Sequence, residues 1–211
     1  LADTFLIIAR QEWDDKHIAL LVDRDLPGFS SESLHGKMGV RAGNTGKLFF
    51  ENVRVAVEDR LGEEGDGFRI AMSALDHGRY TVAAGAVGIV QACLDASVDY
   101  ANKREAGGEP IGRKQLVQQM IAEMVAGADI GRLLYYQVGW MKNEGIRHTR
   151  EVSMAKWRNC AAAFKSASDA IEIHGAAGFS DGYPVERYFR NSRGAMIYEG
   201  THEIHTIMQA E

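Results

Sequence analysis

The spacing of apolar residues divides the chain into a region of short strands and a longer region of helices. Thr4–Ala9 and His17–Val22 are short apolar runs rich in β-branched and aromatic residues, which are typical of strands. Lys47–Val57 alternates in part between apolar and polar positions. A Gly- and acid-rich segment, 61–67, then ends this pattern. The sequence therefore predicts β-structure over residues 1–62.

Downstream of that segment, apolar residues recur at spacings of three and four, the period of an amphipathic helix. The predicted helices cover about 80–103, 113–143, 150–174, 184–189 and 201–209. Long helices joined by short breaks form an up-and-down bundle. We therefore predict an α+β chain, in which the end of a β-barrel-like middle domain (1–62) is followed by an all-α helical bundle (66–211).

Composition is that of an ordinary soluble globular protein. The 211 residues are 45% hydrophobic and 25% charged, and the net charge of -5 argues against nucleic-acid binding. No uninterrupted apolar run reaches the ~18 to 20 residues of a membrane span, so none is expected. Cys93 and Cys160 lie in apolar helical stretches and are expected to be buried thiols in a reducing compartment.

One loop carries a candidate catalytic group. Ile197-Tyr198-Glu199-Gly200-Thr201 places a carboxylate beside a glycine, and Thr201 is suited to cap the following helix. Glu199 is thus a candidate general base, or else a carboxylate that interacts with a helix N-terminus. His202 and His205 have a spacing that suits a metal, but no third ligand accompanies them and no metal is expected.

Several spaced motifs resemble one family. The segment YPVERYFRNSRGAMIYEGTHEI (Tyr183–Ile204) is similar to the C-terminal signature of acyl-CoA dehydrogenases. Met38–Arg41 and Phe50–Val55 resemble the end of that family's β-domain, and Gly62–Phe68 resembles its linker into the helical domain. The resemblance covers the whole chain. It implies an FAD-dependent oxidoreductase of fatty acid metabolism and β-oxidation, and an N-terminal helical domain preceding Leu1.

The resemblance assigns roles to individual residues. Glu199 would remove the α-proton of an acyl-CoA thioester while the β-hydrogen leaves as hydride to flavin N5, giving the trans-2-enoyl-CoA. Some branches of the family place the base just before the Arg of an Asp-x-x-Arg segment, and here that position is glycine, which supports Glu199. The residues implied in substrate binding are Asp76, His77, Gly78, Arg79 and Gly200.

The family's FAD contacts come partly from a neighbouring subunit. The residues of this chain that match them are Arg104, Gln115, Glu172, Ile173, His174, Gly175, Ala176, Thr201, His202 and Glu203. The chain departs from the family pattern at Gly107, where the pattern has Phe, and at Ala176, where many members have a second Gly.

Partners follow from the same resemblance: an acyl-CoA substrate, an electron-transferring flavoprotein as acceptor, and a homotetramer. The protein would be cytoplasmic in a bacterium or lie in the mitochondrial matrix of a eukaryote. Three alternatives remain open: an acyl-CoA oxidase, a nitroalkane-oxidase-like flavoenzyme, or a non-catalytic helical assembly module. The run Thr201–His205 is similar to glutaryl-CoA dehydrogenases, which leaves a dicarboxyl-CoA substrate as a minority hypothesis.

Overall fold

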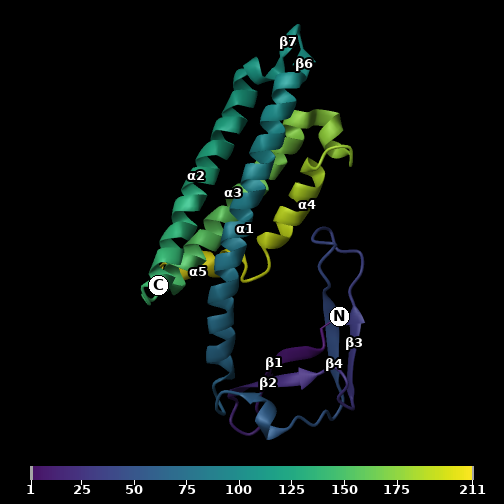
Figure 1. Cartoon of the computed structure of the whole chain (residues 1–211), viewed down its shortest axis with the longest axis vertical. Helices are drawn as coiled ribbons and strands as arrows, with labels where there is room; N and C mark the ends of the chain where they lie inside the picture. The colour runs from purple at the N-terminus through teal and green to yellow at the C-terminus, as the bar shows by residue number, and fades with distance from the viewer. Residues whose placement is uncertain (1, 211) are drawn as a thin grey trace. The chain divides into compact units, whose positions relative to one another are not determined.

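The computed structural model describes residues 2–210, which form two compact units (Figure 1). The first unit comprises Leu1–Lys37 and Arg41–Leu75, and the second comprises Met38–Val40 and Asp76–Glu211. The division between them falls within α1 (Gly67–Lys103), between Leu75 and Asp76, and so lies beyond the segment 61–67 at which the sequence pattern changes.

The first turns of α1 belong to the strand unit because they pack on its second strand. A Cβ added at Gly67 would lie 2.6 Å from the Ile18 carbonyl carbon, so only glycine permits this approach. The ring of Phe68 lies 6.1 Å from that of His17. The helix therefore starts well before residue 80, where the apolar periodicity predicted its start, because this first part is held by contacts that periodicity does not reveal.

The first unit contains two small antiparallel sheets. β1 (Thr4–Arg10), β2 (His17–Asp23) and β5 (Arg60–Leu61) form one in the order β1-β2-β5, and β3 (Phe29–Ser33) pairs with β4 (Gly46–Phe50) in the other. The first two strands were predicted. The sequence prediction missed β3 because its residues, FSSES, include one apolar side chain. It also extended β4 too far, since Val57–Asp59 form a 3-10 turn.

Tilted and edge-on aromatic contacts centred on Phe29 join these two sheets. Phe29 lies 4.9 Å from Phe5 of β1 and 5.3 Å from Phe50 of β4, measured between ring centroids. Among the described residues of this unit, Ala19 and Val22 are the only fully buried hydrophobic side chains. The strand unit therefore has a thin core of its own.

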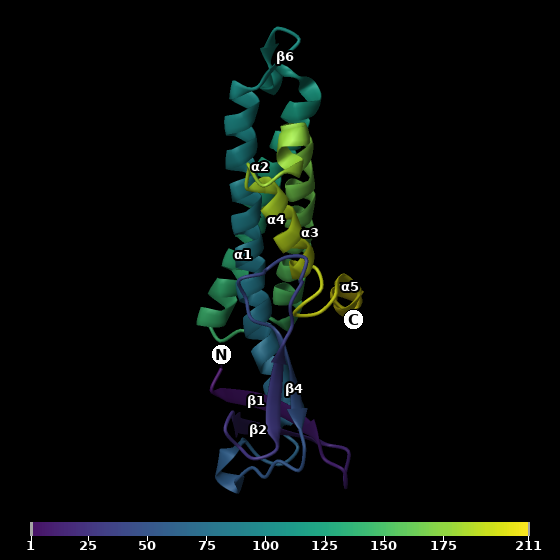
Figure 2. The same cartoon turned by 90° about the vertical axis from the view of Figure 1, so that its right-hand side faces the viewer.

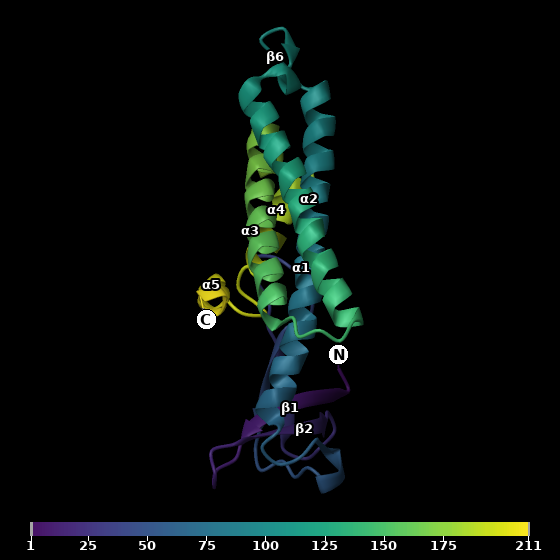
Figure 3. The same ribbon diagram turned by 90° about the vertical axis from the view of Figure 1, so that its left-hand side faces the viewer.

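The second unit is a helical bundle. Its elements after α1 are β6 (Glu105–Ala106), β7 (Glu109–Pro110), α2 (Gln115–Asn143), α3 (Thr149–His174), α4 (Val185–Ala195) and α5 (His202–Ala210). Short 3-10 turns at Ile111–Arg113 and Gly175–Phe179 connect them. The three long helices lie side by side and alternate in direction (Figure 3), and α4 packs along α3 (Figure 2). The predicted α+β class with an up-and-down bundle is confirmed.

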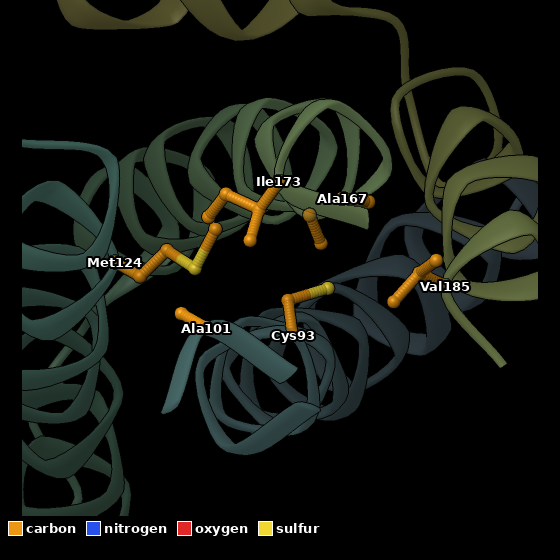
Figure 4. Close-up of a cluster of buried hydrophobic side chains, with 7 residues drawn as sticks. Cys93, Ala101, Met124, Ala167, Ile173 and Val185 are labelled. Carbon is orange, nitrogen blue, oxygen red and sulfur yellow. The ribbon is translucent and has the colours of Figure 1, made fainter. Parts of the chain in front are cut away.

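Side chains from four helices meet in the bundle core (Figure 4). Its buried residues are Cys93 and Ala101 of α1, Met124 of α2, Ala167, Ala170 and Ile173 of α3, and Val185 of α4. Both cysteines are free and buried, as predicted, and burial raises the pKa of Cys93 to about 12 and that of Cys160 to about 11. Such thiols are chemically inert at neutral pH.

The segment predicted only as a helix break is a β-hairpin. Gly107 and Gly108, between β6 and β7, have φ angles of 68° and 82°. Two consecutive residues with positive φ make the tight turn whose twist matches antiparallel strands, and glycine is favoured at both positions. The turn therefore requires a positive φ at position 107, which glycine adopts without strain.

By length and composition, α1 is apolar enough to cross a membrane, with a mean hydropathy of 1.5 over its best window, of which 33% is buried. An apolar core helix of a soluble protein passes the same test. In this chain α1 supplies Ala83, Val90 and Cys93 to the bundle core. Part of its apolar face is thus a core face of the bundle.

Candidate active site

The loop between α4 and α5 holds Glu199 in an unusual backbone conformation. Glu199 has φ 58°, in the left-handed region that non-glycine residues rarely occupy, and Gly200 follows with φ 98°. A non-glycine residue held there costs roughly 1–3 kcal/mol, and such outliers cluster at functional sites. The surrounding contacts must therefore hold this turn in place.

The Glu199 carboxylate lies against α1 at a position that has no side chain. A Cβ added at Gly78 would lie 2.5 Å from Oε1 and 2.6 Å from both Cδ and Oε2 of Glu199. In the part of the chain that the structure describes, Glu199 Oε2 is buried and has no hydrogen-bond partner. A buried, unpartnered carboxylate oxygen calls for an explanation, and a group that accepts a proton from a bound ligand provides one.

Arg79 connects the Glu199 loop to α1 and α3. Its side chain is 7% exposed, and Nε donates to the Glu199 carbonyl oxygen at 3.2 Å. Its Nη1 donates to Asp76 Oδ1 at 3.2 Å, and Thr149 Oγ1 donates to Asp76 Oδ2 at 2.9 Å. Burial of the guanidinium is thereby compensated by an ion pair and a carbonyl. His77 lies on the exposed side of the same helical turn.

A second buried layer comes from α3 and α5. Lys156 Nζ donates to the Gly200 carbonyl oxygen at 2.6 Å, and His205 Nδ1 lies 2.8 Å from Ser153 Oγ. Burial, followed by the nearby charges of Lys156 and Arg79, lowers the pKa of His205 to about 4, so its ring is neutral at pH 7. Burial also lowers the pKa of Lys156, while its attraction to Glu199 opposes that change.

Sequence reasoning missed Lys156 and Ser153. Both lie on the buried face of α3, with Val152, Asn159 and Ala163 at spacings of three and four. The signal that could have revealed Lys156 is a lysine on the otherwise apolar or small-residue face of a helix, because lysine is almost never fully buried without a partner.

A cleft of about 310 Å³ opens beside the loop, between α1 and α4. Its lining includes Thr81, Gly85 and Ile89 of α1, Ala195 of α4, and Tyr198, the neighbour of Glu199. A Cβ added at Gly85 would meet nothing within 4 Å. This cleft is largely apolar, and many of the side chains that line it are small. It lies next to the candidate base.

The residues predicted to contact the cofactor fall into two groups. His174, at the end of α3, stacks on Tyr100 with ring centroids 4.2 Å apart, and Arg104 follows one turn after Tyr100. Exposed Gln115 begins α2 just after the hairpin. This group, which we call the hairpin-end group, comprises Arg104, Gln115, Glu172, Ile173, His174, Gly175 and Ala176.

The second group, Thr201, His202 and Glu203, lies beside Glu199 at the start of α5. α5 packs on the first turns of α3, where His205 meets Ser153. At 1.5 Å per residue, the two ends of α3 are separated by more than about 30 Å. Hydrogen bonds from its own N–H and from Thr201 lower the pKa of the Glu203 carboxyl, and burial lowers that of His202.

Within the hairpin-end group, burial differs sharply. Arg104, Gln115, Glu172 and Ala176 are exposed, whereas Ile173 and His174 are buried in the bundle. His174 Nδ1 bonds to the Ala170 carbonyl oxygen at 2.7 Å, and burial lowers its pKa. Over residues 2–210, no cluster of three His, Cys, Asp or Glu side chains has the geometry to hold a metal.

Comparison with known proteins places this fold and loop in one family. Residues 65–211 match the family model described as acyl-CoA dehydrogenase, C-terminal domain. An acyl-CoA dehydrogenase of Bacillus subtilis (strain 168) is 39% identical over 205 residues, which cover 97% of this chain and 54% of that protein. A glutaryl-CoA dehydrogenase of Desulfococcus multivorans is 42% identical over 182 residues, covering 86% and 46% respectively.

A solved structure agrees with these sequence matches. Butyryl-CoA dehydrogenase from Megasphaera elsdenii superposes with a TM-score of 0.95 at 34% identity, over 99% of this chain and 55% of that one. The chain belongs to the acyl-CoA dehydrogenase family. It spans about half the length of the curated relatives that it matches.

Proposed function

We propose that the protein catalyses FAD-dependent α,β-dehydrogenation of an acyl-CoA thioester, with Glu199 as the base that removes the α-proton. The observation that carries this proposal is the placement of the Glu199 carboxylate over Gly78. There Oε2 is buried and unpartnered among the described residues, beside a cleft of about 310 Å³. A base in this position can reach a thioester whose acyl chain occupies the cleft.

The chemistry divides between the base and the cofactor. Glu199 takes the α-proton as the Cα–Cβ double bond of the enoyl-CoA forms. FAD, when bound, supplies the acceptor for the hydride that leaves Cβ. The Glu199 backbone N–H is proposed to donate to the thioester carbonyl oxygen, which stabilises the charge that develops as the proton leaves. Arg79 supports this arrangement by holding the same peptide unit, because its Nε donates to the Glu199 carbonyl oxygen.

Two separate groups of residues in this chain suit contact with FAD. Arg104 is exposed, and its planar guanidinium suits a pyrophosphate, while Gly175 has φ 56° and lets a ligand approach the backbone closely. This hairpin-end group lies more than about 30 Å along α3 from Thr201, His202 and Glu203. Such a span favours an oligomer, in which the Glu199 end and the hairpin end of one chain contact two different FAD molecules.

The outer face of α2 supports assembly. Leu133, Tyr136 and Trp140 share this face and are 70%, 59% and 58% exposed. Contiguous large apolar side chains on a helix surface usually mark an interface. We propose that a second copy of this chain covers it in a homotetramer, and Leu133→Asp combined with Trp140→Asp should shift the full-length protein to smaller species in light scattering.

The experiment that tests the function is anaerobic mixing of Glu199→Gln with acyl-CoA, followed by flavin bleaching. Gln keeps the shape of Glu but cannot accept the proton, so the variant should retain FAD and bind acyl-CoA while bleaching about 10² to 10⁴ times more slowly. Glu144→Gln, which changes an exposed carboxylate just after α2 that has no assigned role, serves as the matched control and should bleach at nearly the wild-type rate. Bleaching of Glu199→Gln at the wild-type rate would assign the base to another residue.

The same preparation separates the alternatives. An electron-transferring flavoprotein is the proposed acceptor, and fast reoxidation of the bleached enzyme by O₂ would instead indicate an oxidase. A full-length protein purified without yellow flavin would favour the non-catalytic module. Comparing kcat/KM across straight, branched and dicarboxyl CoA esters would define the substrate, including the glutaryl hypothesis.

A further inference from the structure

Lys156 is the largest fully buried side chain in the described part of the molecule, and it has 0% exposure. Its amine donates to the Gly200 carbonyl oxygen at 2.6 Å, and it is also attracted by the Glu199 carboxylate. Burying an amine is costly unless its surroundings compensate for the lost water, so these two interactions are what keep Lys156 at this position.

The carbonyl that Lys156 holds belongs to the strained turn. Glu199 and Gly200 have φ angles of 58° and 98°, and each of the two consecutive carbonyls has its own buried donor. Arg79 Nε donates to the Glu199 carbonyl at 3.2 Å, and Lys156 Nζ donates to the Gly200 carbonyl. Two donors from different helices thus fix the two peptide planes that follow the carboxylate-bearing residue.

Among the described residues, the side chain that donates to the Gly200 carbonyl is that of Lys156. The ring of His205 also faces this turn, with Nε2 3.1 Å from the position of a Cβ added at Gly200, and its Nδ1 lies 2.8 Å from Ser153 Oγ. Without Lys156, the Gly200 carbonyl would lose its bond at 2.6 Å, and the turn would be free to leave the left-handed region.

We propose that Lys156 is a positioning residue for the reaction: by holding the Gly200 carbonyl, it fixes the left-handed turn that places the Glu199 carboxylate over Gly78. This inference rests on the proposed function of Glu199 as the base. Lys156 itself touches the loop backbone and neither proton nor substrate, so its removal should act on the rate of proton removal more than on binding.

The test compares Lys156→Met with Lys165→Met in the full-length, FAD-loaded enzyme. Lys165 lies on the same helix and pairs with Glu123 and Asp169 on the surface, so its substitution controls for loss of a lysine from α3. Lys156→Met should keep FAD and bind acyl-CoA within about threefold of wild type, yet bleach at saturating substrate about 10 to 100 times more slowly, since misplacement of a base by ~1 Å has effects of this size. Lys165→Met should bleach within about twofold of wild type.

Two readouts separate positioning from a merely structural role. With α-deuterated acyl-CoA, Lys156→Met should show a larger primary isotope effect than wild type, because a displaced base makes proton removal more fully rate-limiting. A crystal structure of the variant should show Glu199 outside the left-handed region. An unchanged turn, or an unchanged bleaching rate and isotope effect, would overturn the inference.

If Lys156→Met does not fold, Lys156→Gln carries the test, because it keeps a shorter, uncharged hydrogen-bond donor at the buried position. It should bleach at least about fivefold more slowly than wild type, and a wild-type rate would overturn the inference. Failure of this inference can be distinguished from failure of the proposed function. Wild-type bleaching by Glu199→Gln would remove the base assignment, whereas slow Glu199→Gln with wild-type bleaching by the Lys156 variants would remove only the role of Lys156.

Discussion

The two ends of α3 differ in whether the polar residues around them are buried and bonded within the chain or exposed. At its start, Ser153 and Lys156 are buried and bonded to His205 and Gly200, and they surround the Glu199 loop. At its other end, the polar groups of the hairpin-end group, such as Arg104 and Gln115, are exposed. The first end is therefore closed by contacts within one chain, whereas the second leaves polar side chains exposed.

Under the proposed function, this difference in burial matches the different needs of a base and of a cofactor contact. A base needs a fixed position and exclusion of water, which buried hydrogen bonds provide. Side chains that contact a cofactor shared with another chain must lie on the surface. The consequences of substitution should therefore differ at the two ends, as the following four predictions state.

The largest effect is expected from pH at the Glu199 end. The folded pKa of His205 is about 4, below its ordinary 6.5, so between these values the unfolded chain binds more protons than the folded one. Stability should therefore fall as pH drops from about 6.5 to about 4, by up to about 3 kcal/mol from this residue. Urea unfolding at a series of pH values measures it.

His205→Gln should flatten that dependence, and His35→Gln, at an exposed position, should not. Some dependence should remain, because burial also lowers the pKa of His174 and His202. An identical pH dependence in wild type and His205→Gln would show that His205 is not the buried neutral group inferred from its surroundings.

Gly78→Ala should reduce activity without reducing stability. The new Cβ would lie 2.5 Å from Glu199 Oε1 and push the carboxylate aside, so flavin bleaching should slow about 10²-fold. Alanine also favours a helix interior over glycine by about 1 kcal/mol, so the melting temperature should hold or rise. Gly88→Ala, where an added Cβ meets nothing within 4 Å, is the control and should leave bleaching unchanged.

At the hairpin end, Arg104→Ala should weaken FAD binding about tenfold, the usual size of a lost charge-assisted hydrogen bond. Assembly should weaken with it, because a ligand shared between subunits stabilises the oligomer by mass action. Flavin titration and light scattering measure the two effects, and adjacent Lys103→Ala, also exposed, should change neither. A fully flavinated monomer of Arg104→Ala would break the proposed link between this end and assembly.

The smallest effect concerns Gly107, where the family pattern alone favours a return to Phe. The φ of 68° makes Gly107→Phe destabilising by about 1 kcal/mol, whatever contact the ring gains with cofactor. Gly107→Asn should lose less than half as much stability, because asparagine tolerates left-handed backbone better. Thermal unfolding of both variants and of wild type measures these losses. Equal stability of wild type and Gly107→Phe would contradict the hairpin turn.

How far the sequence predicted each feature depended on the range of the interactions. Apolar spacing predicted the three long helices because each buries a continuous stripe, and it located both cysteines in the core. It failed at β3, whose five residues carry one apolar side chain, and at the start of α1, where Gly67 packs on His17 and Ile18. Those elements are set by partners that lie far along the chain.

What the sequence by itself determined is the fold class, the family and the loop that bears Glu199, because these follow from local periodicity and from contiguous motifs. Only the tertiary structure decided how that loop is held. The carboxylate meets Gly78 across helices, and Arg79 and Lys156 converge on the Glu199 and Gly200 carbonyls from α1 and α3. A buried hydrogen bond joins residues by their position in space, and the chain carries no local signal of which distant carbonyl a buried lysine will bind.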